Sequence, residues 1–171
     1  SKDPFALRRA SLAVLRILVE KDLDLDLREC LELAVAQFPA DTLAPGCTEQ
    51  VLAYMIERFR AWFEEEDIAT EVFRAVSARQ LSRPLDIQRR VHAVDAFTRL
   101  PEAAALAAAN KRVSNILGKL EADHQFGDVS ANLLQEPQET LLAEQLAALA
   151  EVCRDHLARD EYTQALACLA G

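Results

Sequence analysis

Glycine is scarce in this sequence, with only 4 among 171 residues, and runs of β-branched residues are missing. Because strands favour β-branched residues, the sequence gives little support to a sheet. Ala and Leu, which favour helices, dominate instead, and apolar residues make up 51% of the chain, enough to bury a core and to exclude extensive disorder. This composition predicts an all-α protein, a multi-helix bundle of about eight helices.

Long apolar runs are absent as well. The segment LAVLRILV is interrupted by Arg16, well short of the roughly 20 residues that a membrane-spanning helix needs. The opening, SKDPFALRR, lacks the apolar stretch of a signal peptide. We therefore expect no membrane partner. Since the chain opens almost directly on a helix, we also expect it to be an excised piece of a longer protein.

The common catalytic signatures are missing: the sequence contains no GxxxxGK, GxGxxG, GxSxG or HExxH. The three histidines, His92, His124 and His156, lie far apart, and none stands beside a Ser or Cys in a nucleophile pattern. We therefore expect no catalytic residue in this chain.

The four cysteines form no CxxC pair, and no histidine lies at ligand spacing from them, so we expect free thiols and no metal site. Cys30, Cys153 and Cys168 are flanked by aliphatic residues and are predicted to be small core residues. The acidic run from Glu64 to Asp67 is predicted to be a solvated corner, because neighbouring side chains on a helix do not converge on a metal.

Apolar spacing and capping residues predict the helices of the first half. The first begins at Asp3 and Pro4, and the second runs from Asp26 through Phe38. Thr48 is expected to cap the third, which should supply the largest part of the core through Leu52, Met55, Ile56, Phe59 and Phe63. A fourth helix follows the acidic corner almost at once.

Prolines introduce the later helices. Pro84 marks a boundary, after which a fifth helix is expected to run to Leu100. Pro101 is expected to start a sixth helix. Residues 122–137 form the longest irregular segment. Pro137 starts a seventh helix with an apolar face, and Asp160 caps a last short one. The inward residues of the seventh are expected to be Leu141, Leu142, Leu146, Leu149 and Val152.

Charge is distributed unevenly. The chain has a net charge of −9, but residues 74–119 hold nine cations and three acids, so that window is +6 and the remainder is −15. A basic island in an acidic chain suggests a local anionic partner. Chance clustering on solvated helix faces explains the charge count equally well.

The stretch LAAANKRVSNILGK, residues 106–119, divides into two faces when placed at about 100° per residue. The apolar, predicted core face comprises Leu106, Ala109, Val113, Ile116, Leu117 and Leu120. The opposite face comprises Lys111, Arg112, Asn115 and Lys119, with no acid between Glu102 and Glu121 to pair with them. Such a face can contact phosphates, or it can be a solubilising surface whose acids come from another helix.

Three more polar residues belong to this region. Arg89 points away from the apolar stripe of the fifth helix, and Arg90 sits on the flank of that stripe. Asn110 lies at the edge of the apolar arc, and we expect it to be structural, with its amide bonded to a neighbouring helix or loop.

Two long motifs resemble a known family. SKDPFALRRASLAVLRILVEK, residues 1–21, and DIQRRVHAVDAFTRLPEAAALAAANKRVSNILGK, residues 86–119, closely resemble the C-terminal part of the β subunit of bacterial two-subunit (α2β2) glycyl-tRNA synthetase. Residues 47–80 and 137–171 resemble the family in their pattern of residue types, but their sequence motifs are less specific.

The resemblance implies a cytoplasmic α/β heterotetramer that joins glycine to tRNA(Gly) using ATP and Mg²⁺. The α subunit would hold the aminoacylation site, and the β subunit would recognise tRNA. Residues 1–83 would be the end of an HD-like domain with connecting helices. Residues 84–171 would resemble the DALR-type anticodon-binding domain of arginyl-tRNA synthetases, truncated at the C-terminus.

On this reading, the residues expected to contact the tRNA backbone are Arg89, Arg90, Lys111, Arg112, Asn115 and Lys119. The main alternative is a helical scaffold for assembly of the α and β subunits without direct tRNA contact. A third reading, a hydrolase of HD type, lacks a visible metal-binding His-Asp pair.

Overall fold

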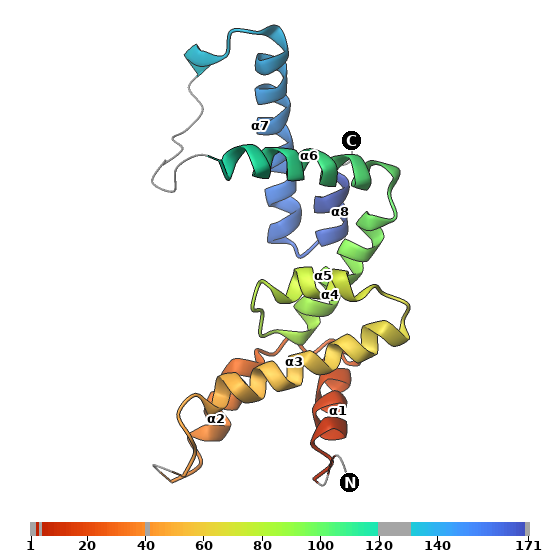
Figure 1. Ribbon diagram of the computed structural model, residues 1–171. Helices are drawn as coiled ribbons and strands as arrows, with labels where there is room; N and C mark the ends of the chain where they lie inside the picture. Colours follow the sequence, from red (N-terminus) through yellow and green to blue (C-terminus); the bar gives the residue numbers. More distant parts are fainter. Residues whose placement is uncertain (1–2, 4, 40–41, 120–130, 170–171) are drawn as a thin grey trace. The chain divides into compact units, whose positions relative to one another are not determined.

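The structure is a computed structural model that describes residue 3 and residues 5–39, 42–119 and 131–169 (Figure 1). Within these residues the chain is all α, with no strand, and this confirms the predicted fold class. The elements are α1 (Leu7–Glu20), α2 (Leu27–Val35), α3 (Cys47–Glu65), α4 (Thr70–Ser77), α5 (Pro84–Thr98), α6 (Pro101–Leu117), the 3-10 turn η1 (Ala131–Leu133), α7 (Pro137–Ala158) and α8 (Tyr162–Ala167).

The chain forms two compact units, 1–95 and 96–171, which divide inside α5. Each unit is described by itself below. The predicted boundary between residues 83 and 84 separates a region that resembles an HD-like domain from one that resembles a DALR-type domain. It stays a prediction. None of the helices in the described parts of the chain is both long enough and apolar enough to cross a membrane.

The core of the first unit is built on α3, which contacts α1, α2 and α4. Phe59 is completely buried and stacks on Trp62 and Phe63, with ring centroids 5.5 and 5.3 Å apart. The expected inward face of α3 is confirmed, although Ile56 is only partly buried. The other helices add Leu15, Leu18, Leu27, Val72, Phe73, Val76, Ile87 and Val91.

Asp26, at which the second helix is predicted to begin, is the N-cap of α2. Its carboxylate accepts hydrogen bonds from the backbone N–H groups of Arg28 and Glu29, at 2.8 and 3.4 Å. The Ser82 hydroxyl donates to the same carboxylate at 2.8 Å, and Ser82 O accepts from Leu27 N at 2.9 Å. These bonds tie the segment before α5 to the start of α2.

Two helices of the first unit begin differently from the prediction. Ala6, with a φ of 55°, is the N-cap of α1, so the helix starts after Asp3, and Pro4 lies outside the described residues. Gly46, with a φ of 76°, precedes α3 in place of a side-chain cap from Thr48. Glycine adopts this left-handed conformation without the steric cost that a Cβ brings.

Two other helix ends also differ. The helix α2 ends at Val35, before Phe38, and Phe38 is exposed. The N-cap of α8 is Glu161, because Asp160 adopts a φ of 57° and its carboxylate accepts instead from the Tyr162 hydroxyl at 2.8 Å.

The second unit contains much less buried surface. The helix α8 packs against α7 and buries Tyr162 and Ala165, whereas α7 has no fully buried residue. The predicted inward position is wrong for four residues of α7, which are exposed, and Leu149 is only partly buried. The exposed residues are Leu141, Leu142, Leu146 and Val152. The apolar period marks a face that can be buried, but it does not supply the element that covers it.

All four cysteines are free, as expected. The prediction of a core position is wrong for Cys30, which is exposed, while Cys153 and Cys168 are partly buried.

We expect Phe59→Ala to destabilise the first unit by about 3–5 kcal/mol, because it leaves a cavity among stacked rings. The chain has a single tryptophan, Trp62, so its fluorescence during urea unfolding reports on this unit. Phe38→Ala, at a side chain that is 53% exposed, is the control and should cost far less. Equal losses in the two variants would contradict the assignment of Phe59 to the core.

Asp26→Ala should cost about 1 kcal/mol at pH 7, the usual value of a helix cap. Burial raises the pKa of Asp26, but hydrogen bonds from Ser82, Arg28 N and Glu29 N outweigh it and hold the pKa below the ordinary 3.8. A carboxylate with a depressed folded pKa stabilises above its unfolded pKa, and this contribution fades as pH falls through the folded value. Urea unfolding at pH 7 and well below pH 3.8 should show the difference shrink, whereas Glu20→Ala, at an exposed carboxylate of α1, should show little difference at pH 7.

Candidate nucleic-acid interface

The predicted cationic face lies on α6 and the turn after it. Lys111, Arg112, Asn115 and Lys119 are all exposed, and none of their side chains makes a hydrogen bond or ion pair with another residue that the structure describes. Lys111 and Asn115 follow each other at one helical turn, roughly 6 Å along the axis. Lys119 lies beyond the helix end at Leu117, and its N–H donates to Ile116 O at 3.2 Å. We call these four residues the α6 ladder.

The helix dipole does not explain these cations. Basic residues stabilise a helix mainly in its last turn, where the unpaired carbonyls lie. The last turn of α6 contains no basic residue, and the only acid of the helix, Glu102, lies in its first turn. The ladder therefore leaves its charge available to an external anion.

Arg89 and Arg90 belong to the first unit, whereas the α6 ladder belongs to the second. Arg89 is exposed. Arg90 is half-buried, and its Nε donates to both carboxylate oxygens of Asp86, one turn earlier, at 3.0 and 2.9 Å. The charge of Arg90 is thus already compensated within its own helix, which distinguishes it from the ladder.

Two exposed cations of the basic island were not selected from the sequence. Arg74 on α4 and Arg79 just after it form no ion pair with a described residue. Arg83, by contrast, pairs with Asp24 at 2.6 Å. The excess of cations in the 74–119 window was the available signal for Arg74 and Arg79.

The apolar face of α6 is exposed, contrary to the prediction of a core face. Leu106, Val113, Ile116 and Leu117 expose 37, 52, 56 and 44% of their surface, and Ala103 is the one buried residue of the helix. Asn110 is exposed and its side chain bonds to no described residue, so its structural role stays a prediction. The helix therefore presents both a cationic and an apolar face to its surroundings.

The first unit has a groove of about 410 Å³, floored by apolar side chains such as Leu52, Ile56 and Phe73. Arg28 and Glu49 stand on its wall and pair at 2.7 Å, and hydrogen bonding from the guanidinium lowers the pKa of the exposed Glu49. Ser77 also lines the groove, and its buried hydroxyl makes no hydrogen bond to a described residue.

The described residues include no group of three or more His, Cys, Asp or Glu side chains placed to hold a metal. In the acidic corner Glu64, Glu65 and Glu66 are exposed, and they pair with three different residues. Their partners are Arg60, Arg16 and His92.

A sequence model of the glycyl-tRNA synthetase beta subunit matches residues 1–78. Relatives match far beyond that segment. The glycine–tRNA ligase beta subunit of Chromohalobacter salexigens is 52% identical over 170 residues, 99% of this chain. Those of Pseudomonas aeruginosa and Mannheimia succiniciproducens are 52 and 47% identical over 171 residues.

The chain belongs to the glycyl-tRNA synthetase β-subunit family. It spans about a quarter of the length of the relatives named, 25% in each case. The matches include α6 and its ladder as well as the first unit, so the family resemblance seen in the two motifs is confirmed for the whole chain.

Replacing Val113 and Ile116 together by Gln should change the stability of the chain by no more than about 0.5 kcal/mol per site, because both side chains are exposed. Thermal unfolding followed by circular dichroism measures the change. Ile87→Gln, at a residue that is 2% exposed, should be strongly destabilising by comparison. A loss of about 2 kcal/mol or more in the double variant would mean that the apolar face of α6 is packed in solution.

Proposed function

We propose that this chain is the tRNA-recognition part of a glycine–tRNA ligase β subunit. In this role it supports the ATP-dependent attachment of glycine to tRNA(Gly) by the α subunit. The observation that carries the proposal is the α6 ladder, an exposed set of cations and an amide whose side chains pair with no described residue, in a chain of this family.

The net negative charge of the chain limits the places at which it can contact tRNA. With a net charge of −9, the chain as a whole repels a polyanion, so binding must use local cationic surface. Each ladder cation can neutralise one phosphate and release its counterions, and the Asn115 amide can bond to sugar, phosphate or a base edge. Lys111, Arg112 and Lys119 can do this without first breaking an ion pair to any residue that the structure describes.

The arginines of α5 would contribute differently. Arg90 would have to share or exchange its bonds to Asp86, and this reduces the net gain from a phosphate. We therefore rank the ladder above Arg90 among the backbone contacts.

The chemistry itself is assigned to the other subunit. We propose that ATP and Mg²⁺ act in the α subunit of a cytoplasmic α/β heterotetramer. Arginine and lysine side chains of this chain would orient the tRNA toward that subunit.

The second candidate is a helical scaffold for subunit assembly. The exposed apolar residues Leu141, Leu142 and Leu146 of α7, which expose 55–57% of their surface, favour it. A protein partner that covers this face would gain roughly 25 cal/mol for each Å² of apolar surface removed from water.

Salt dependence of binding distinguishes the two candidates. In the intact β subunit we expect the plot of log affinity for tRNA(Gly) against log salt concentration to be steep. Lys111→Glu with Lys119→Glu should lower the magnitude of its slope by about 1.4–1.8, since each lost phosphate contact removes roughly 0.7–0.9. Filter-binding titrations at several salt concentrations give the slope.

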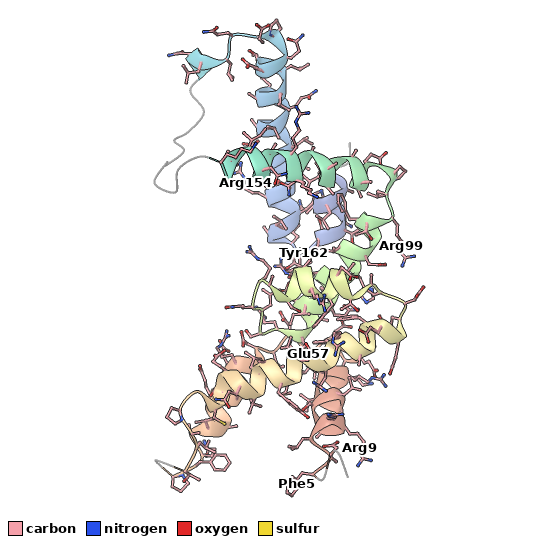
Figure 2. The ribbon with its side chains drawn as sticks, viewed as in Figure 1. Phe5, Arg9, Glu57, Arg99, Arg154 and Tyr162 are labelled. Atoms are coloured by element: carbon pink, nitrogen blue, oxygen red, sulfur yellow. The ribbon has the colours of Figure 1, made fainter. Side chains whose placement is uncertain are left out.

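A matched control separates contact from overall charge. Arg154→Glu with Arg159→Glu makes the same change in net charge at two exposed residues of the same unit, one in α7 and one at its C-cap (Arg154 is labelled in Figure 2). Equal slopes in the two double variants would remove the ladder from the interface. Intact tRNA binding with loss of α-subunit association in α7 variants would favour the scaffold for that face.

A further inference from the structure

The helices α7 and α8 pack against each other as a hairpin (Figure 1), and a cysteine in α7 and another at the C-cap of α8 lie at or near the contact between them. The Cys153 thiol of α7 donates to the backbone carbonyl of Ala165 in α8, with an Sγ–O distance of 3.4 Å. Ala165 is buried, so this contact lies on the side of α8 that faces α7.

Cys168 lies on the same side of α8. It follows Ala165 by three residues, a spacing that places side chains next to each other on a helix. Because the Cys153 thiol bonds to Ala165, this spacing places the Cys168 side chain beside it, and Cys168 contributes to the raised pKa of Cys153. Both side chains are partly buried and both are free, so small reagents can reach them.

The turn between the two helices is held by several bonds. His156 Nδ1 and Glu161 Oε2 are 2.7 Å apart, and Glu161 N donates to His156 O at 2.9 Å. Tyr162, the first residue of α8 and labelled in Figure 2, donates from its hydroxyl to Asp160 at 2.8 Å. These bonds within the hairpin hold α8 against α7 and so keep the two thiols on facing sides of the two helices.

We propose that Cys153 and Cys168 form a dithiol site that closes to a disulfide on reaction with a small-molecule disulfide of the glutathione class. The bond would fasten the C-terminal end of α8 to α7, at the end of α8 opposite the turn.

The exchange is balanced in two steps. The Cys168 sulfur attacks one sulfur of oxidised glutathione, and a mixed disulfide forms while one glutathione thiolate leaves. The Cys153 sulfur then attacks the Cys168 sulfur and expels the second glutathione. The two thiol protons pass to the two leaving thiolates, so the dithiol loses two electrons and the oxidant gains them.

The surroundings of Cys153 suit it to the second step. Burial raises the pKa of the Cys153 thiol, and the neighbouring Cys168 thiol raises it further. A thiol with a raised pKa holds little thiolate and is a slow first attacker. Once Cys168 carries glutathione, however, Cys153 is the thiol already next to it, and proximity favours closure.

The test treats the intact β subunit with oxidised glutathione, blocks the remaining thiols with iodoacetamide and maps the peptides by mass spectrometry. We expect the Cys153–Cys168 disulfide to exceed glutathione adducts at these two sites by about tenfold or more, because a neighbouring thiol acts at a high effective concentration. Cys30 and Cys47, in the other unit, serve as internal controls and should carry glutathione or the blocking group.

Two further results decide the matter. Cys168→Ser should leave Cys153 without its partner, so the linked peptide pair disappears and Cys153 carries a glutathione adduct or the blocking group. Separate adducts on Cys153 and Cys168 in the unmodified sequence, or a disulfide from either to Cys30 or Cys47, would overturn the proposal. The wild-type measurement needs no variant to fold.

Discussion

The stacked rings of α3 are the constraint on which the first unit depends. Phe59, Trp62 and Phe63 recur at three- and four-residue spacing, so they lie on one side of a 19-residue helix, with their ring planes within 18° of parallel. Such an apolar surface must be buried away from water, and α1, α4 and α5 supply aliphatic residues that pack in the same core. The chain must reverse at each end of α3 to bring them there, which explains the left-handed residues Gly46 and Asp67. Even the bond from Ser82 to Asp26 serves this arrangement, because it fixes where α5 begins.

The second unit obeys a different principle. Its helix α6 buries a single residue, yet six of its first ten residues, PEAAALAAAN, are alanine, which has the highest helix propensity of any residue. Local propensity can therefore support a helix whose side chains are left for other purposes. The outcome is a helix with a cationic face and an apolar face, both exposed. Phosphates suit the first face, and a protein surface suits the second.

The sequence predicts best those features that follow from the chemistry of a single side chain, such as an aromatic ring that must be buried or a carboxylate that caps a helix. The aromatic face of α3 and the cap at Asp26 are of this kind, and both are confirmed. It failed where the decisive partner is not encoded locally: the apolar stripes of α6 and α7 have the period of a core face but stand exposed. The backbone of Gly46, rather than the Thr48 hydroxyl, starts α3, because cap rules score side chains and miss left-handed turns. In the candidate site, the exposure of the ladder followed from its spacing. The pairing of Arg90 with Asp86 also follows from their i, i+4 spacing on one helix.

The two exposed faces of α6 make the tRNA and scaffold readings compatible in one molecule. A phosphate contact at Lys111 lies on the opposite side of the helix from Val113 and Ile116, so a protein surface could cover the apolar stripe while the ladder stays open. Covering that stripe would remove water from one side of α6, hold the helix in place and lower the entropy lost when tRNA binds. Subunit assembly and tRNA affinity would then be coupled through one helix, with salt acting on the ladder alone. Because screening weakens phosphate contacts far more than apolar contacts, ionic strength separates the two contributions even when both faces are occupied.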